Sequence, residues 1–168
     1  QFAVVNGANS GSLADFLVDD VSVTIPGLGV NFCAANANSL GVAASMAAQG
    51  SSLAAENNLT LAANGLAAGS FGFFLASELT GFTANPGGSQ GNLCLAGSIG
   101  RYVGPGQIQQ ADSGGGITLM LDLLAVPQPT GFVAVAAGEA WSFQAWYRDS
   151  IAGQATSNFT DGLTVTFQ

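Results

Sequence analysis

The chain has 168 residues, of which only 7% are charged, and its formal net charge at pH 7 is −8. An ordinary soluble domain carries about 25% charged residues. Histidine and lysine do not occur, and the only two cations are Arg101 and Arg148. Two arginines cannot neutralise a run of phosphates, so the composition argues against nucleic acid and against an anionic membrane surface as partners. We also expect no membrane span, because no apolar run reaches the roughly 18 residues that a spanning helix needs.

Apolar residues alternate with a period of two along much of the chain, which predicts strands rather than helices. In chain order, strands are expected at residues 2–5, 21–25, 59–63, 71–77, 93–99, 117–123, 132–136, 141–148 and 163–168. The alanine-rich stretch 39–48 fits either a short helix or a small-residue strand. A strand is favoured, because the stretch runs into Gly50-Ser51-Ser52 without a capping pattern. Short strands with glycine-rich turns between them predict an all-β fold, an antiparallel β-sandwich of the jelly-roll or Greek-key type.

A composition shift near Pro26 divides the chain into an N-terminal arm, residues 1–26, and a sandwich domain, residues 27–168. The arm holds two apolar strand patterns, and a strand without a partner must pair with something. Three alternatives stay open: the sheet of the same chain, an upstream domain, or the open edge of a neighbouring subunit. The apolar residues expected to form this assembly arm are Phe2, Val4, Val5, Phe16 and Val18.

The two cysteines, Cys33 and Cys94, are too few for a structural zinc site, and no histidine can complete one. This leaves a disulfide or two buried thiols. Scarce lysine, abundant small polar residues and a low isoelectric point are typical of an extracellular protein, in which a disulfide is the default. A bridge that closes a loop of this length would stabilise the fold by roughly 4 kcal/mol.

Several sequence blocks carry a family resemblance. They are Asn-Phe-Cys at 31–33, Phe-Gly-Phe-Phe at 71–74, Gly-Asn-Leu-Cys-Leu at 91–95, the aromatic block with Arg-Asp at 141–149, and the closing block at 157–163. With them, the chain from residue 31 onward resembles a β domain that recurs, usually at the C-terminal end, in secreted proteins of planctomycetes and similar bacteria. The resemblance implies an extracellular β-sandwich with its two cysteines bridged. It implies no activity and no catalytic residues, and the arm lies outside it.

The strand expected at 141–148 has two different faces. Trp141 and Tyr147 share the apolar face, which we assign to the core. Trp146, Gln144 and Arg148 share the opposite face, which makes them a candidate ligand platform, with the tryptophan stacking on a sugar ring. Arg148 is also followed by Asp149, and this pair, with Asp161 nearby if the last two strands pair, would grip a ligand carboxylate or form an ion pair between strands.

Metal and catalytic chemistry find little support in the sequence. Asp19 and Asp20 are weak metal candidates, since they lack the spaced Asp-x-Asp-x-Asp loop that suits calcium. A serine hydrolase needs a base that the chain does not have, and nothing in the spacing of the acids favours a catalytic carboxylate pair. We therefore expect no enzyme activity, no metal and no cofactor.

Two functions compete. The first is a non-enzymatic extracellular structural protein that self-associates as a homo-oligomer or filament, in the more specific form a fibre subunit joined through its N-terminal strand. The alternative is a carbohydrate-binding or adhesion module of a secreted protein, with a polysaccharide as its partner.

Overall fold

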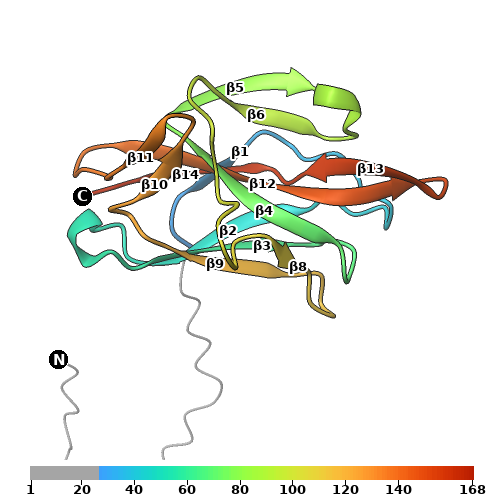
Figure 1. Ribbon diagram of the computed structural model, residues 1–168, viewed down its shortest axis with the longest axis horizontal. Coiled ribbons are helices and arrows are strands. Elements are labelled where there is room, and N and C mark those ends of the chain that lie inside the picture. Colours follow the sequence, from blue (N-terminus) through green and yellow to red (C-terminus); the bar gives the residue numbers. More distant parts are fainter. Residues whose placement is uncertain (1–26) are drawn as a thin grey trace, which may run out of the picture.

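The structure is a computed structural model that describes residues 27–168 (Figure 1). Its regular elements are antiparallel strands, and the helices in this part of the chain are two short 3-10 turns, η1 (Ala54–Glu56) and η2 (Pro86–Gly88). The predicted all-β fold is therefore confirmed. Within residues 27–168, no helix is long and apolar enough to cross a membrane. The strand patterns expected at 2–5 and 21–25, and with them the whole predicted arm, lie outside the described residues.

A seven-stranded antiparallel sheet forms the middle layer of the fold (Figure 1). Its main order is β1-β14-β12-β4-β7, while β13 also pairs with β12 and β8 also pairs with β4. The strands are β1 (Val30–Phe32), β4 (Phe71–Ser77), β7 (Gly100–Arg101), β8 (Gln109–Gln110), β12 (Ala140–Ile151), β13 (Gln154–Phe159) and β14 (Gly162–Thr166). Three of the strands predicted from alternation, at 71–77, 141–148 and 163–168, thus become β4, β12 and β14.

A three-stranded sheet in the order β2-β3-β9 covers one face of the middle sheet. Its strands are β2 (Ser45–Gly50), β3 (Leu59–Asn64) and β9 (Ile117–Leu121). The alanine-rich stretch ends as a strand, as favoured above, but that strand begins only at Ser45. The physical reason is a turn at Asn38, whose side-chain Oδ1 accepts the backbone N–H groups of Leu40 and Val42 at 3.0 and 3.2 Å.

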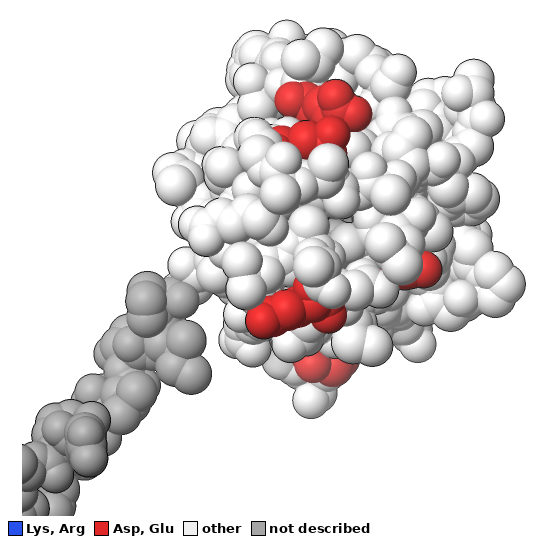
Figure 2. Space-filling view, turned by 90° about the vertical axis from the view of Figure 1, so that its left-hand side faces the viewer, with Lys and Arg blue, Asp and Glu red and all other residues white. Residues whose placement is uncertain are grey.

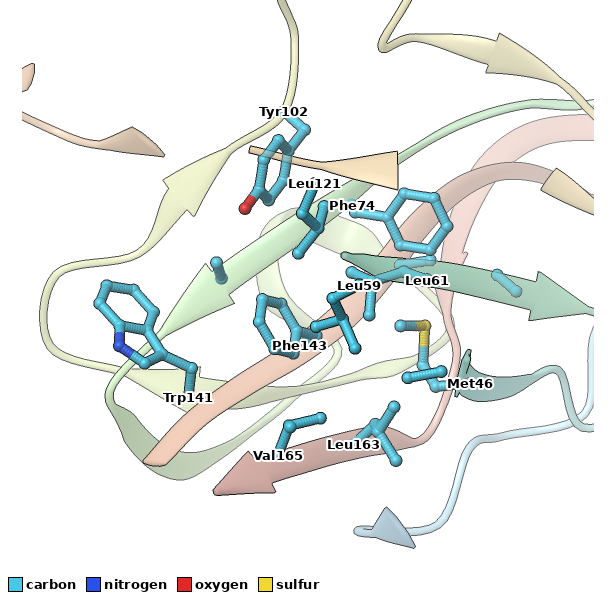
Figure 3. Packing of buried hydrophobic residues seen from close by; sticks show 14 of the residues in the cluster. Met46, Leu59, Leu61, Phe74, Tyr102, Leu121, Trp141, Phe143, Leu163 and Val165 are labelled. Carbon is cyan, nitrogen blue, oxygen red and sulfur yellow. The ribbon is translucent and has the colours of Figure 1, made fainter. Parts of the chain in front are cut away.

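The main core lies between these two sheets (Figure 3). Large side chains from both sheets meet there, and each is at most 3% exposed: Met46, Leu59, Leu61 and Leu121 on one side, and Phe74, Trp141, Phe143, Leu163 and Val165 on the other. Burying a side chain of this size contributes about 1.5–3 kcal/mol. The assignment of Trp141 and Tyr147 to the core is confirmed, since both are fully buried.

A hairpin of β5 (Leu79–Ala84) and β6 (Asn92–Ala96) lies over the other face of the middle sheet (Figure 1). It encloses a second apolar cluster, in which Leu75, Leu95 and Phe159 are buried. A further hairpin of β10 (Val126–Gln128) and β11 (Gly131–Val133) lies beside β7. The middle sheet is therefore covered on both faces over part of its area. The sequence did not predict β5, whereas its partner β6 overlaps the strand expected at 93–99, and it is β6 that contributes Leu93 to the candidate site.

The ribbon of β13 and β14 is interrupted where it passes along β12. The backbone N–H of Thr160 donates to the carbonyl of Ala145 at 3.0 Å, and the hydroxyl oxygen of Thr160 accepts the N–H of Ala145 at 2.9 Å. The next residue, Asp161, accepts the backbone N–H of Met46 at 2.6 Å and the side-chain amide of Asn31 at 3.0 Å. Asn31 also donates to the carbonyl of Met46 at 2.8 Å. Side chains therefore satisfy the polar backbone groups of Met46 on the β2 edge strand.

Candidate functional site

A disulfide joins Cys33 to Cys94, as predicted, with a Cα–Cα distance of 6.3 Å. Cys33 directly follows β1 at the edge of the middle sheet, and Cys94 lies in β6 of the covering hairpin. The bridge therefore fastens the hairpin to the sheet. This fastening matters for the site, because the space under the hairpin is where the predicted ligand platform lies.

Gln144 does not belong to an exposed platform, which corrects the sequence-based prediction. Its side chain is fully buried. The Oε1 atom accepts the backbone N–H of Cys94 at 2.9 Å, and the Nε2 atom donates to the carbonyls of Asn92 and Thr160 at 2.9 and 2.8 Å. The alternation along β12 placed Gln144 on the outward face correctly, but the hairpin covers that face at this point. The residue is thus an anchor for β6.

Trp146, two residues further along β12, lines a pocket of about 450 Å³ between the middle sheet and the hairpin. The pocket is lined by Phe73, Leu75, Pro86, Gly87, Leu93, Ile99, Arg101, Trp146 and Phe159. The ring centroids of Phe73 and Trp146 are 5.0 Å apart and their planes are tilted by 31°. This volume lies in the range of small-molecule sites, which are mostly apolar with a few polar groups. Trp146 is partly exposed, as a ligand-contacting ring must be.

Strand register places both arginines on the same face as Trp146. Trp146 pairs with Phe73 in β4 and with Phe159 in β13, which forms one row of aromatic side chains across three strands. The neighbouring row on one side contains Arg101, because this residue pairs with Leu75 in β4. Arg148 lies two residues beyond Trp146 along β12, in the row on the other side. Directly paired residues and residues two apart share a face of a sheet, so the aromatic row has an arginine on either side.

Two further pockets share lining residues with this one, and the three together outline a groove. On one side, a pocket of about 380 Å³ shares Trp146 and Gly87 and adds Arg148 and Thr156. On the other side, a pocket of about 390 Å³ shares Ile99 and Arg101 and adds lining residues from β10 and the turn after it. We call the three together the outer groove. None of its lining residues is acidic.

Arg101 was missed by the sequence analysis, which named only Arg148 as a candidate cation. Both side chains are exposed. Within residues 27–168, neither guanidinium forms a hydrogen bond with another residue. The composition could have indicated Arg101, because it is one of only two cationic side chains that could bind an anionic ligand.

The predicted clamp of Arg148 with Asp149 is not formed, because neighbouring residues of a strand point to opposite faces. Asp149 points inward and accepts from the backbone N–H groups of Ser39 and Ser150 and from the side chain of Asn158. Burial raises the pKa of Asp149, but these hydrogen bonds outweigh it and hold the pKa below its ordinary value.

Asp161 does not join the predicted clamp either, since its hydrogen bonds go to β1 and β2. Burial raises the pKa of this carboxyl above its ordinary value, and the bonds from Met46 and Asn31 offset only part of that effect.

Acidic side chains are found away from the groove. Figure 2 shows one end of the molecule, on which several acidic side chains are visible and no arginine is. Among residues 27–168, no three histidine, cysteine or acidic side chains gather in a way that would hold a metal ion. The weak metal candidates Asp19 and Asp20 lie outside this part of the chain.

Comparisons with protein-family models, with curated proteins and with solved structures give no match for this chain. The resemblance to a secreted bacterial β domain therefore stays a hypothesis.

Proposed function

We propose that this protein is a non-enzymatic extracellular binding module that holds a carbohydrate chain in the outer groove. The observation that carries the proposal is the partly exposed Trp146 ring, which lies beside Phe73 in a pocket of about 450 Å³. An aromatic ring of this kind offers an apolar surface on which the flat C–H face of a sugar can pack. The pocket shares lining residues with a further pocket on either side, an extended arrangement that suits a chain of sugar units.

Binding is favoured over catalysis by the chemistry of the lining residues. Among residues 27–168, the only titratable side chain that lines the main pocket is Arg101. A guanidinium stays protonated, so it serves neither as a general base nor as a nucleophile. The residues present can hold and orient a ligand, and they offer no group that would exchange protons with it near neutral pH.

An extracellular setting is supported by the disulfide between Cys33 and Cys94. Such bridges persist in oxidising surroundings and are rare in reducing cytosol. Because the bridge holds the hairpin over the sheet, an oxidising environment would also preserve the shape of the groove.

The proposal is tested by screening the whole chain on a polysaccharide array and by titration calorimetry with the best binder. We expect Trp146→Ala to weaken binding by at least about tenfold, because it removes the aromatic surface. Trp146→Leu retains much of the packing volume without a flat ring, and should weaken binding similarly. Phe132→Ala is the matched control, since this side chain is 73% exposed on β11 and lines none of the three pockets.

Tryptophan fluorescence gives an independent measurement on the unaltered protein. Trp141 is fully buried, so a ligand in the groove should change the emission of Trp146 alone. Failure of every carbohydrate to bind, or unchanged affinity in both Trp146 variants, would overturn the proposal.

Assembly through the N-terminal arm is a second candidate function. The observation that favours it is the position of β1, the terminal strand of the middle sheet, which follows residues 1–26 almost directly and exposes 72% of Val30. A strand at this place can guide a preceding segment toward a neighbouring sheet edge. Deleting residues 1–12 should abolish large assemblies in light scattering and electron microscopy. Unchanged assembly after the deletion, or a monomeric parent protein at high concentration, would contradict this function.

A further inference from the structure

We infer that the ligand of the outer groove is an acidic polysaccharide, whose carboxylate or sulfate groups bind Arg101 and Arg148 while a sugar ring packs on Trp146. This inference rests on the proposed function and narrows it to one chemical class. It depends on three observations: where the cations are, what surrounds them, and how far apart they lie.

The placement of the cations is the first observation. The chain has ten acidic residues and only two cations, and both cations lie on one face of one sheet. They line the same groove, Arg101 in its main pocket and one further pocket, and Arg148 in the other. Low-dielectric walls strengthen the attraction of a cation for an anion. In a chain of net charge −8, this groove is therefore the place where an anionic group is most favoured.

The freedom of the two guanidinium groups is the second observation. No acid lines the groove, and within residues 27–168 neither arginine is bound to another side chain. Guanidinium groups match carboxylate and sulfate oxygens with paired hydrogen bonds. Both arginines can thus bind a ligand without first giving up an internal partner.

The spacing is the third observation, and it separates an acidic polysaccharide from nucleic acid. Arg101 and Arg148 are two strands and four residues apart in register. With strands about 4.8 Å apart and a rise of about 3.3 Å per residue, their α-carbons lie roughly 16 Å apart. Two cations this far apart match anionic groups carried on separate sugar units. Duplex nucleic acid carries a charge about every 1.7 Å of its length and is bound by neutralising a run of phosphates, which two widely spaced arginines cannot do.

The test compares pairs of polymers that share one sugar backbone, of which one member is charged and the other is neutral. The first pair is oligogalacturonate and its methyl ester, and the second is dextran sulfate and dextran. Calorimetry at low ionic strength should show binding of at least one charged member and about a hundredfold weaker binding of its uncharged partner, since the partner loses both arginine contacts. Affinity should also fall as salt is added. The pair that responds tells whether carboxylate or sulfate is the preferred group.

Arginine variants test the two contacts directly. Arg101→Gln and Arg148→Gln should each weaken binding of the charged polymer by about tenfold and leave binding of the neutral polymer unchanged. Arg148→Gln combined with Glu56→Gln restores the net charge of −8, and Glu56, in η1, lines none of the three pockets. If the local contact matters, this double variant should bind as weakly as Arg148→Gln alone. Thermal unfolding midpoints verify that each variant is folded, which is expected because both side chains are exposed.

The possible failures are distinct. Equal binding of the charged and uncharged polymers, with no effect of either arginine variant, would overturn this inference and leave the carbohydrate proposal standing. Tighter binding of a single-stranded DNA oligonucleotide than of either acidic polymer would also overturn it. Binding of no carbohydrate at all would overturn the proposed function, and this inference with it.

Discussion

The side chain of Gln144 accepts the backbone N–H of Cys94 at 2.9 Å, and this bond joins the middle sheet to the hairpin above it. The same Cys94 is covalently bridged to Cys33. One residue of β6 is therefore held twice, by a hydrogen-bonded amide from beneath and by a disulfide from the side. The wall of the outer groove depends on both connections.

Replacing Gln144 should loosen the hairpin and destabilise the whole fold. Gln144→Met retains the side-chain volume but removes the partner of the buried Cys94 N–H and of the carbonyls of Asn92 and Thr160, which we expect to cost about 3 kcal/mol. Gln144→Glu should cost more, because it brings a carboxylate against the carbonyls of Asn92 and Thr160. Urea unfolding measures both losses. Gln49→Met, at an exposed position of β2, is the control and should change stability by less than about 0.5 kcal/mol.

Removing the disulfide should destabilise the protein by roughly 4 kcal/mol, because the bridge closes a loop between residues 61 apart. The variant to compare is Cys33→Ala with Cys94→Ala, measured by the same urea unfolding. Combined with Gln144→Met, the losses should be less than additive, since both changes release the same strand. Strictly additive losses would show that the two connections act independently.

Gly100 should not tolerate a side chain. A Cβ atom at this position of β7 would overlap the backbone carbonyl of Pro127 in β10. Gly100→Ala should therefore cost about 2–3 kcal/mol in free energy of unfolding, as β10 is displaced. Gly106→Ala provides the comparison, because it meets open space and carries only the cost of a φ of +75°, about 1 kcal/mol. Equal losses in the two variants would argue against close packing of β7 on β10.

The protein should lose stability in acid as the carboxylate of Asp149 becomes protonated. Its pKa is held below the ordinary value of 3.8, so the stability that it contributes is present above that pH and is lost as the pH falls through the lowered pKa. Asp149→Asn should remove this contribution. The difference in unfolding free energy between parent and variant should be largest near neutral pH and shrink below pH 3.8. A difference that stays constant across this range would contradict the prediction.

The two tyrosines should resist deprotonation. Burial, with a smaller effect of nearby Asp149, raises the pKa of Tyr147 from 10.0 to about 12. Burial and the nearby Asp122 carboxylate raise the pKa of Tyr102 as well. The phenolate absorbance of the folded protein should therefore stay low at pH 10, where an exposed tyrosine is half ionised. Because the folded pKa values lie above the unfolded ones, stability should fall as the pH rises beyond 10.

Local alternation was enough to predict the faces of β12 but not what covers them. The inward residues Trp141 and Tyr147 were assigned correctly, because a period of two determines direction. The outward face was expected to meet solvent. It meets the hairpin at Gln144, through a bond between residues 50 apart in sequence. The exposed Leu79 and Phe82 show why β5 gave no signal, since neither has its apolar side chain buried.

The two arginines show a second limit. Arg148 was noticed because it lies in a long aromatic strand, whereas Arg101 ends a strand of two residues with no pattern around it. Sequence adjacency also suggested that Arg148 pairs with Asp149, but a strand places neighbours on opposite sides. Only the strand register brings Arg101, Trp146 and Arg148 to one groove, because the pairing joins segments far apart in the chain.

The disulfide and the buried amide that fasten the covering hairpin both reach β6 and not β5, and this has an evolutionary consequence. Every side chain of β5 is at least partly exposed, and a register irregularity between Thr80 and Thr83 already loosens its pairing. Substitutions there disturb neither the bridge nor the buried amide. We expect related proteins to diverge fastest in the sequence of β5, while the groove retains its shape. Such proteins would then keep the same ligand preference even where their β5 sequences no longer resemble one another.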